Sequence, residues 1–450
     1  MLGNRKEASL EKRKRKTMPK GKKKGGRKSV DSRQSSDNDV DTPENMSVVS
    51  ENWSTESIPE DGASADAEVD EVSTQENFED KLKECIEGTT EKSAETRKNS
   101  IQGIMQAMRK KYTFDFFQDR KMTVTDSLKR CLSKGKGEEQ ALAGTCVSLL
   151  CVTLGGSEDC EAVYEEIKPM LQTVLLDNSA ALKARASCAT TLGLCTFVCV
   201  DDVMQIRAVM NTLESVFKAS YFKGNGVAPT HSPEVASLHC SALSAWTLLL
   251  SISPPSYVEE FIDSHLSKLP QLLISSLVDL RIAAGEALAL LYELARQDDE
   301  EFEGDDMDSL CAMLKGLATD SQKFRAKKDR KQQRSSFRDI LRTVEDGDFP
   351  DETVKFGVHD ESLYIDSWVK KVQYNALCQV MATGMNTHLQ ENVLIRDIFG
   401  LGAPIPVSTL PKTKIHRYER HLMNTAVAKA RTKVRAKTRD KRTVSVSSTG

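Results

Sequence analysis

The stretch DLRIAAGEAL at residues 279–288 decides the fold class of this chain. Arg281 is followed by a small residue three positions later, Ala284, and by an aliphatic residue seven positions later, Leu288. On a helix these positions share one face, so the small residue lets a neighbouring helix approach and the aliphatic residue fills the seam. Gly285 in mid-helix costs about 1 kcal/mol relative to Ala and therefore predicts tight packing.

The same order of polar, small and aliphatic residues begins at Arg97, Gln140, Arg185 and Arg281, at spacings of 43, 45 and 96 residues. A period of about 40–47 residues is typical of HEAT and armadillo repeats. A missing copy is expected in the widest gap, with residues 235–252 around Trp246 as its second helix. We interpret Arg281 as structural, bonding carbonyls or acids in the adjacent turn. The sequence predicts an all-α, HEAT/armadillo-like helical-repeat solenoid without a convincing set of strands.

Charge is distributed in blocks along the 450 residues, although the net charge is only -3. Residues 5–28 are basic, residues 31–80 are acidic, and residues 412–442 are basic again. Such polar blocks bury too little apolar surface to offset the entropy lost on ordering. We therefore expect a disordered basic-then-acidic arm (1–75), a helical-repeat domain (76–345), a helical continuation and linker (346–411), and a basic C-terminal helix and tail (412–450).

Several classes of protein are disfavoured by the sequence. The longest apolar run is about half of the 18 or more residues that a membrane span needs, and no apolar stretch follows the basic N-terminus, so we expect no membrane association and no secretion. The 11 cysteines form no Cys-x2-Cys pair, which favours buried thiols in a reducing compartment over metal sites. No catalytic or cofactor motif occurs, so we expect neither an enzyme nor a small-molecule substrate, and no cofactor.

The first basic segment, residues 323–342, contains apolar anchors that include Phe324 and Phe337. We expect a helix whose aromatic side docks on the solenoid and whose basic side faces outward. Like charges at i,i+4 repel in water, and a polyanion would relieve that cost. An ordinary solvated helix face is the alternative. The candidate RNA-binding residues here are Lys323, Arg325, Lys327, Lys328, Arg330, Lys331 and Arg334.

The second basic segment begins near His416 and places a cation at every second position from Lys429. Two residues advance a helix by about 200°, so these charges fall on opposite sides of a thin rod that has no apolar stripe. Such a rod suits a channel walled by RNA phosphate. A disordered basic tail or an import signal is the alternative. The candidate RNA-binding residues are Lys429, Arg431, Lys433, Arg435, Lys437, Arg439, Lys441 and Arg442.

The N-terminal arm holds a further basic cluster that fits a nuclear-import signal. Its candidate residues are Arg13, Lys14, Arg15, Lys16, Lys22, Lys23 and Lys24.

The basic segments carry a family resemblance: FRAK at 324–327, QRSSFRD at 333–339, RHL at 420–422, KARTK at 429–433 and RDKR at 439–442. Together with RIAAGE at 281–286 and YIDSW at 364–368, they resemble the interferon-related developmental regulator family over about residues 75–442. The resemblance implies regulators of differentiation, including nuclear co-regulators that act with histone deacetylase complexes. It also implies a ribosome-binding translational repressor whose C-terminal helix lies in the mRNA channel of idle ribosomes.

Residues and resemblance together favour a non-catalytic, ribosome- and rRNA-binding repressor of translation. The alternative is a nuclear transcriptional co-regulator that scaffolds histone deacetylase complexes and transcription factors. A transport-receptor-like solenoid is a third hypothesis, but the sequence has no regular Trp/Asn array of that kind. We expect both cytoplasmic and nuclear localisation.

Overall fold

The computed structural model describes residues 66–224, 226–320, 327–349, 351–357 and 361–405, with side chains described from residue 75 in the first helix and from residue 328 in α12. Two units divide the chain, Met1–Ala63 and Ser64–Gly450, and all described residues belong to the second. None of the helices described there is long and apolar enough to cross a membrane.

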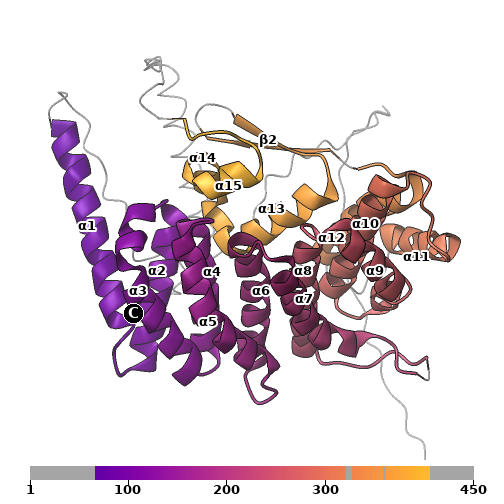
Figure 1. Ribbon diagram of the computed structural model, residues 1–450, viewed down its shortest axis with the longest axis horizontal. Coiled ribbons are helices and arrows are strands. Elements are labelled where there is room, and N and C mark those ends of the chain that lie inside the picture. The colour runs from indigo at the N-terminus through magenta and orange to yellow at the C-terminus, as the bar shows by residue number, and fades with distance from the viewer. Residues whose placement is uncertain (1–65, 225, 321–326, 350, 358–360, 406–450) are drawn as a thin grey trace, which may run out of the picture. The chain divides into compact units, whose positions relative to one another are not determined.

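The helices up to α12 are arranged in consecutive pairs, and in each pair the odd-numbered helix packs on the even-numbered helix that follows it (Figure 1). The even-numbered helices also pack side by side in succession, which confirms the all-α helical-repeat solenoid. Short 3-10 segments, η1 (Lys218–Ser220) and η2 (Leu269–Ile274), interrupt the later turns. The pairs are α1 (Asp66–Gly88) with α2 (Ala94–Lys110), α3 (Phe114–Lys134) with α4 (Glu138–Leu154), α5 (Glu158–Leu176) with α6 (Leu182–Cys199), α7 (Val203–Phe217) with α8 (Pro233–Leu250), α9 (Pro255–His265) with α10 (Val278–Asp298), and α11 (Met307–Thr319) with α12 (Lys327–Asp346).

The polar residue of each predicted repeat has one common role. Lying near the start of an even-numbered helix, it donates hydrogen bonds to carbonyls at or just beyond the end of the preceding segment, where a helix leaves its last carbonyls without partners. The sequence pattern therefore marks a recurring tie between consecutive helices. Its instances are Arg97 to Glu91 O (2.9 Å) and Lys92 O (2.8 Å), Gln140 to Leu132 O (2.9 Å), Arg185 to Leu175 O (2.8 Å), and Arg281 to Ser275 O and Ser276 O (3.3 Å).

The missing repeat is present where the sequence predicts it. Helix α8 covers residues 233–250, and Trp246 within it is completely buried. Gly193 on α6 lies so close to α8 that an added Cβ would be 2.6 Å from the Cβ of Ala245. Small residues therefore set the spacing between successive even-numbered helices, as the repeat pattern implies.

Helix α1 begins at Asp66, within the last part of the arm (1–75) that the sequence predicts to be disordered. Extending an existing helix costs far less than starting one, and the C-terminal half of α1 is anchored by the buried residues Leu82 and Ile86. Composition alone indicated polarity and missed this extension.

A two-stranded antiparallel sheet, β1 (Glu352–Phe356) and β2 (Glu361–Ile365), lies within the predicted helical continuation and linker (346–411). Val354 lies opposite Leu363 in its register. Within the two strands, the buried residues are Phe356, Leu363 and Ile365. Such a short alternation of buried and exposed residues is too weak a pattern to predict strands from sequence. An isolated hairpin is marginal in water, and this one packs against α13 (Trp368–Met381) and α14 (Met385–Glu391).

The C-terminal segment folds back onto the even-numbered helices. It consists of α13, η3 (Ala382–Gly384), α14 and α15 (Val393–Ile398), and Figure 1 shows these helices alongside the row from α2 to α10. Helix α13 packs on α4, α8 and α10, whereas η3 and α14 pack on α2. Arg109 on α2 donates to Val380 O at 2.8 Å, and Gly384 lies so near that an added Cβ would be 2.0 Å from Arg109 O. One segment therefore bridges several repeats.

Buried polar groups fix this segment further. His388 Nε2 donates to Met108 O at 2.8 Å, and Asn392 Nδ2 donates to Val152 O at 3.0 Å and lies 3.2 Å from His388 Nδ1. Both side chains are completely buried, and burial lowers the pKa of His388 below its ordinary value. Met108 and Val152 lie near the C-terminal ends of α2 and α4, so the segment satisfies carbonyls that water would otherwise bind.

Candidate nucleic-acid interface

Helix α12 docks on α10 through its apolar side. Phe337, Ile340 and Val344 are completely buried. An added Cβ on Gly285 of α10 would lie 2.7 Å from Ile340 Cδ1 and 3.0 Å from Phe337 Cε1. Only glycine permits this approach without movement of the neighbours, so the close packing predicted from Gly285 is confirmed.

Two arginines on α10 hold α12 in place. Arg281, 1% exposed, donates to the side-chain oxygen of Gln333 on α12, which confirms its structural interpretation. Arg296 donates to Thr343 O at 2.6 Å and to Val344 O at 2.8 Å, near the C-terminal end of α12. A cation at that end also complements the helix dipole. The orientation of α12 is thus fixed along most of its length.

The opposite side of α12 presents a row of cations, which we call the α12 basic stripe: Lys328, Lys331, Arg334 and Arg338. Lys328, Lys331 and Arg338 are exposed and Arg334 is half-buried. Spacings of three and four residues place these side chains on one helical face. The predicted amphipathic docking of this helix is therefore confirmed for its described residues.

The other candidate cations of this region differ from the stripe. Arg330 is partly buried, toward the docked side, and its carbonyl accepts a hydrogen bond from Arg334 Nε at 3.2 Å. Arg342 continues the stripe but pairs with Asp348 at 2.9 Å. Arg338 was not among the candidate residues, although its i,i+4 spacing from Arg334 was a usable signal.

Many predicted site residues lie outside the described part of the chain. These are Lys323 and Arg325, the side chain of Lys327, the C-terminal set (Lys429, Arg431, Lys433, Arg435, Lys437, Arg439, Lys441 and Arg442), and the import set (Arg13, Lys14, Arg15, Lys16, Lys22, Lys23 and Lys24).

The chain is firmly held just before its basic C-terminal segment. Arg396 on α15, 1% exposed, forms an ion pair with Glu361 at 2.8 Å. The same guanidinium donates to Leu401 O and Gly402 O, each at 2.8 Å. Described residues end at 405, and the basic segment begins at residue 412. The segment therefore follows closely on a fixed attachment.

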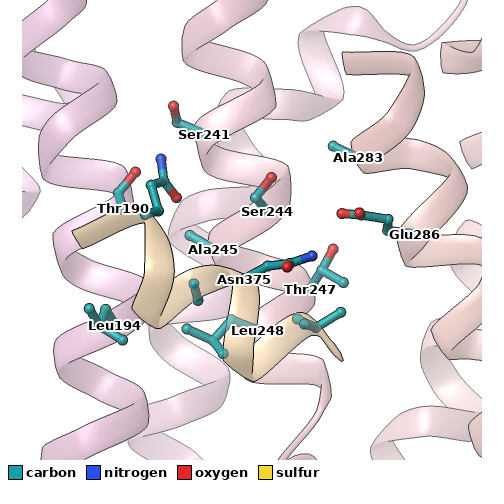
Figure 2. Close-up of a pocket in the computed structure, with 13 residues that line it drawn as sticks. Thr190, Leu194, Ser241, Ser244, Ala245, Thr247, Leu248, Ala283, Glu286 and Asn375 are labelled. Atoms are coloured by element: carbon teal, nitrogen blue, oxygen red, sulfur yellow. The ribbon is translucent and has the colours of Figure 1, made fainter. Parts of the chain in front are cut away.

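A pocket of about 100 Å³, partly open to solvent, lies where α13 crosses α6, α8 and α10. Figure 2 shows Glu286 pointing across it toward Ser244 and Asn375. Burial raises the pKa of Glu286 to about 7, against the opposing charge of Lys371. Hydroxyls, amides and one carboxylate are the polar lining among the described residues, and no histidine or cysteine accompanies them.

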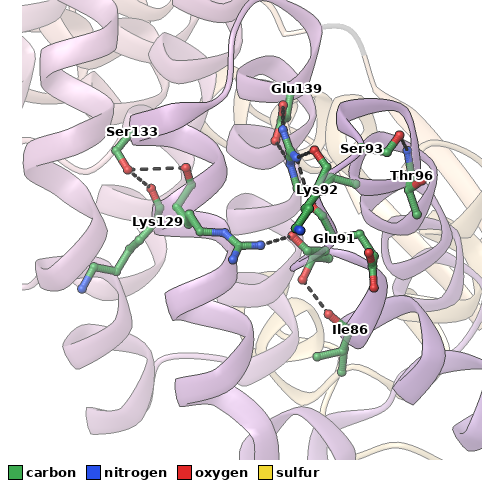
Figure 3. A network of polar contacts seen from close by, with 11 residues as sticks. Ile86, Glu91, Lys92, Ser93, Thr96, Lys129, Ser133 and Glu139 are labelled. Carbon is green, nitrogen blue, oxygen red and sulfur yellow. Dashed lines mark hydrogen bonds and ion pairs between the residues drawn. The ribbon is translucent and has the colours of Figure 1, made fainter.

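Other charged side chains are used in packing. Arg97 on α2 forms a two-pronged ion pair with Glu139 on α4, at 2.6 and 2.8 Å. Figure 3 labels Glu139 within this network of polar contacts. Arg130 on α3 donates to Thr89 O at 2.7 Å, near the turn after α1. These arginines join three consecutive helices, so they are structural cations, in contrast to the α12 basic stripe.

Cysteines form a second grouping that sequence reasoning missed. Most of the 11 are buried, as expected of core thiols, and burial raises the pKa of Cys188 to about 12. The sulfurs of Cys151, Cys160 and Cys199, however, all lie within 4.8 Å of one another. A usable signal was the i,i+4 spacing of Cys195 and Cys199 on one helix.

The chain matches the family described as Interferon-related developmental regulator over residues 45–345, and the Interferon-related protein conserved region over residues 392–443. It is 47% identical to Interferon-related developmental regulator 1 of Sus scrofa over 388 residues, 86% of this chain and 85% of that protein. It is 46% identical to Interferon-related developmental regulator 2 of Mus musculus over 376 residues, 83% of this chain and 85% of that protein.

Among solved structures, a designed armadillo repeat protein is similar with a TM-score of 0.36 and 13% identity, covering 58% of this chain and 99% of that one. The family match spans the repeats and α12, and the second matched region begins at Asn392, which fixes the C-terminal segment. The chain therefore belongs to the interferon-related developmental regulator family.

Proposed function

We propose that this protein is a non-catalytic regulator of gene expression that binds ribosomes through rRNA and represses translation. Its basic C-terminal segment, residues 412–442, would occupy an RNA channel of idle ribosomes. The observation that carries the proposal is the α12 basic stripe, a row of cations along one side of a helix. The other side of this helix is buried against the repeats.

The charge and exposure of the stripe suit contact with a phosphate backbone rather than burial in the protein. Lys328 and Arg338 are exposed, so each can reach a phosphate without leaving the helix. Cations that repel one another on one helix face are stabilised when a polyanion lies beside them. Contacts of this kind position a protein on RNA and carry no sequence information, as expected of a factor that binds every ribosome.

A second point of contact supports the same function. The cations from Lys429 to Arg439 alternate along the chain shortly after the attachment fixed by Arg396. Two linked contacts raise the effective concentration of each, so overall affinity can exceed either one by about 10²–10⁴-fold. Affinity should then depend on both the stripe and the C-terminal segment.

Sedimentation of cell extract through sucrose gradients, at low and moderate salt, tests the proposal. We expect the full chain to sediment with monosomes rather than polysomes, and deletion of residues 412–450 to abolish this. If about 6–8 phosphates are contacted, affinity should fall about 10³-fold or more between 50 and 200 mM salt.

A matched pair of variants tests the stripe. Lys328→Gln with Arg338→Gln should weaken ribosome binding and reduce the salt slope by about 1–2. Lys218→Gln with Lys268→Gln removes equal charge from two exposed residues away from α12 and should change neither. If both double variants weakened ribosome binding equally, the stripe would contribute only through the overall charge of the protein.

The nuclear co-regulator hypothesis is the other outcome of this experiment. Absence from every ribosomal fraction at low salt, with repression of a reporter gene unchanged by the 412–450 deletion, would support a scaffold for histone deacetylase complexes instead.

A further inference from the structure

Three consecutive helices bring their cysteines together at one point. Cys151 lies in the last turn of α4, Cys160 in the first turn of α5, and Cys199 at the end of α6. Cys160 Sγ lies 2.8 Å from Cys199 Sγ and 3.4 Å from Cys151 O. The three sulfurs lie within 4.8 Å of one another, the only such group of possible metal ligands found among the described residues.

Distances of this size match a shared metal ion. A zinc–sulfur bond is about 2.3 Å, so two sulfurs on one tetrahedral zinc ion lie about 3.8 Å apart. Here one separation is 2.8 Å and none exceeds 4.8 Å, so small side-chain rotations would bring the sulfurs to the spacing of a shared ion. Thiolate sulfur is also the ligand that soft metal ions such as Zn²⁺ prefer.

A fourth thiol is adjacent. Cys195 lies one turn before Cys199 on the same face of α6, outside the group of three sulfurs that lie within 4.8 Å of one another. The Cys195-x3-Cys199 spacing falls within the two to four residues, roughly, that separate paired ligands in structural zinc sites.

We propose that Cys151, Cys160 and Cys199 bind a thiophilic divalent metal ion of the Zn²⁺ class, with Cys195 as the fourth ligand. Cys151, Cys160 and Cys195 are completely buried, as in a closed structural site, whereas Cys199 is only partly covered and gives the ion a route from solvent. The bound ion would tie the α3/α4 repeat to the α5/α6 repeat at the turn between α4 and α5. It would stabilise the folded chain because the site is assembled only on folding.

Metal retention by the full-length chain tests this site. The protein is purified under reducing conditions, loaded with Zn²⁺, dialysed, and analysed for metal by mass spectrometry. We expect about one ion per chain. Cys160→Ala and Cys199→Ala should each lower metal affinity about 10-fold or more. Cys188→Ala, a buried thiol on α6 outside the cluster, is the matched control and should retain the ion.

Two measurements separate loss of metal from loss of folding. Circular dichroism should show the same helix content for Cys160→Ala as for Cys188→Ala. Zn²⁺ should raise the melting temperature of the wild type and of Cys188→Ala, but not that of Cys160→Ala. With Co²⁺ as the probe, the wild type should show sulfur-to-cobalt charge-transfer absorbance. An unchanged cobalt spectrum in Cys195→Ala would overturn the assignment of the fourth ligand.

The site as a whole is overturned by either of two results. One is a reduced wild type that retains no Zn²⁺ or Co²⁺ while a thiol reagent titrates all 11 cysteines. The other is an intact mass two hydrogens lower under non-reducing conditions, with a Cys160–Cys199 disulfide in the peptide map. Neither result bears on ribosome binding, so this inference stands or falls separately from the proposed function.

Discussion

Arg281 on α10 donates a hydrogen bond to the side-chain oxygen of Gln333 on α12, and both side chains are almost completely buried. The amide nitrogen of Gln333 in turn donates to Leu317 O of α11 at 3.2 Å. A residue that begins a repeat motif in sequence thus reaches the helix that presents the α12 basic stripe. The docking of α12 depends on a buried polar chain as well as on apolar contact.

Replacing either member of this pair should destabilise the protein. Arg281→Leu leaves the Gln333 oxygen and the Ser275 carbonyl without their donor, at a cost of about 2–3 kcal/mol. Gln333→Leu should cost a similar amount, and the double variant should cost less than the sum by about 0.5 kcal/mol or more. Urea unfolding measures all three. Arg342→Ala, which loses only an exposed ion pair, should change stability by less than about 1 kcal/mol. Strict additivity would show that the two side chains act independently.

Adding a single methyl group at Gly285 should loosen α12. The new Cβ of Gly285→Ala meets Ile340 and Phe337, so we expect a destabilisation of about 1–3 kcal/mol by overpacking. Ile340→Val removes the nearest carbon and should recover part of this loss in the double variant. Gly316→Ala on α11 is the control, because its Cβ meets nothing within 4 Å and should stabilise the helix by about 0.5–1 kcal/mol. Thermal unfolding distinguishes the two, and equal effects would contradict the packing argument.

The carboxyl group of Glu286 should make stability fall as pH rises. Burial raises its folded pKa from 4.5 to about 7, so between these values the folded state holds the proton more tightly than the unfolded state. The stabilisation is complete below about 4.5 and is lost as pH rises through 7. Glu286→Gln should therefore be more stable than the wild type at pH 8, by a margin that shrinks toward pH 4.5.

Glu214 provides the opposite case, because the ring of His265, whose Nε2 lies 3.7 Å from a carboxylate oxygen of Glu214, holds the pKa of Glu214 below its ordinary value. Its stabilisation is present above the ordinary value and is lost as pH falls. Glu214→Gln should thus weaken the protein at pH 7 but not at low pH. The urea midpoint of each variant, measured from pH 4 to 8, checks both predictions. If the midpoints of Glu286→Gln and Glu214→Gln changed with pH in the same way, the opposite pKa shifts assigned to the two carboxyl groups would be wrong.

Asn392 should control whether the C-terminal segment stays attached. Asn392→Ala removes the donor to Val152 O and the acceptor that caps Ile395 N. We expect amide hydrogen exchange to rise about 10-fold or more in α13, α14 and α15, with little change in α7 and α9, because local opening costs less than global unfolding. Gln390→Ala is the control, because this partly exposed neighbour makes its side-chain hydrogen bonds to Asn386 on the same helix. Uniform loss of protection would mean that the segment and the repeats unfold together.

The repeat architecture was predictable because the same residue types recur along the sequence at a regular spacing. Arg185 and Arg281 sit at equivalent helix positions, and the polar, small and aliphatic order recurs at a nearly constant period. Periodic signals accumulate over many residues, so both the fold class and the docking of α12 could be read from sequence. The start of α1 and the short β1–β2 pair lacked such repetition.

The remaining features depend on contacts between distant residues. His388 reaches Met108 across 280 positions, and no local pattern indicates that the C-terminal segment would return to α2. Cys160 and Cys199 lie 39 positions apart, close to one repeat period, so repeat stacking brought together thiols that spacing rules for zinc motifs had dismissed. Tertiary pairing, rather than propensity, decided both outcomes.

The hydrogen bond from Arg109 to Val380 spans 271 positions of the chain. Ordinary solenoids can grow one repeat at a time as synthesis proceeds, because each unit needs only its neighbours. In this protein, the surface of α2 is synthesised early, but the residues that cover it are translated about 271 positions later. Closing so large a loop raises the contact order, so this folding step should be slow and should follow formation of the repeats. Until then, the unfinished nascent chain leaves that surface open to chaperones.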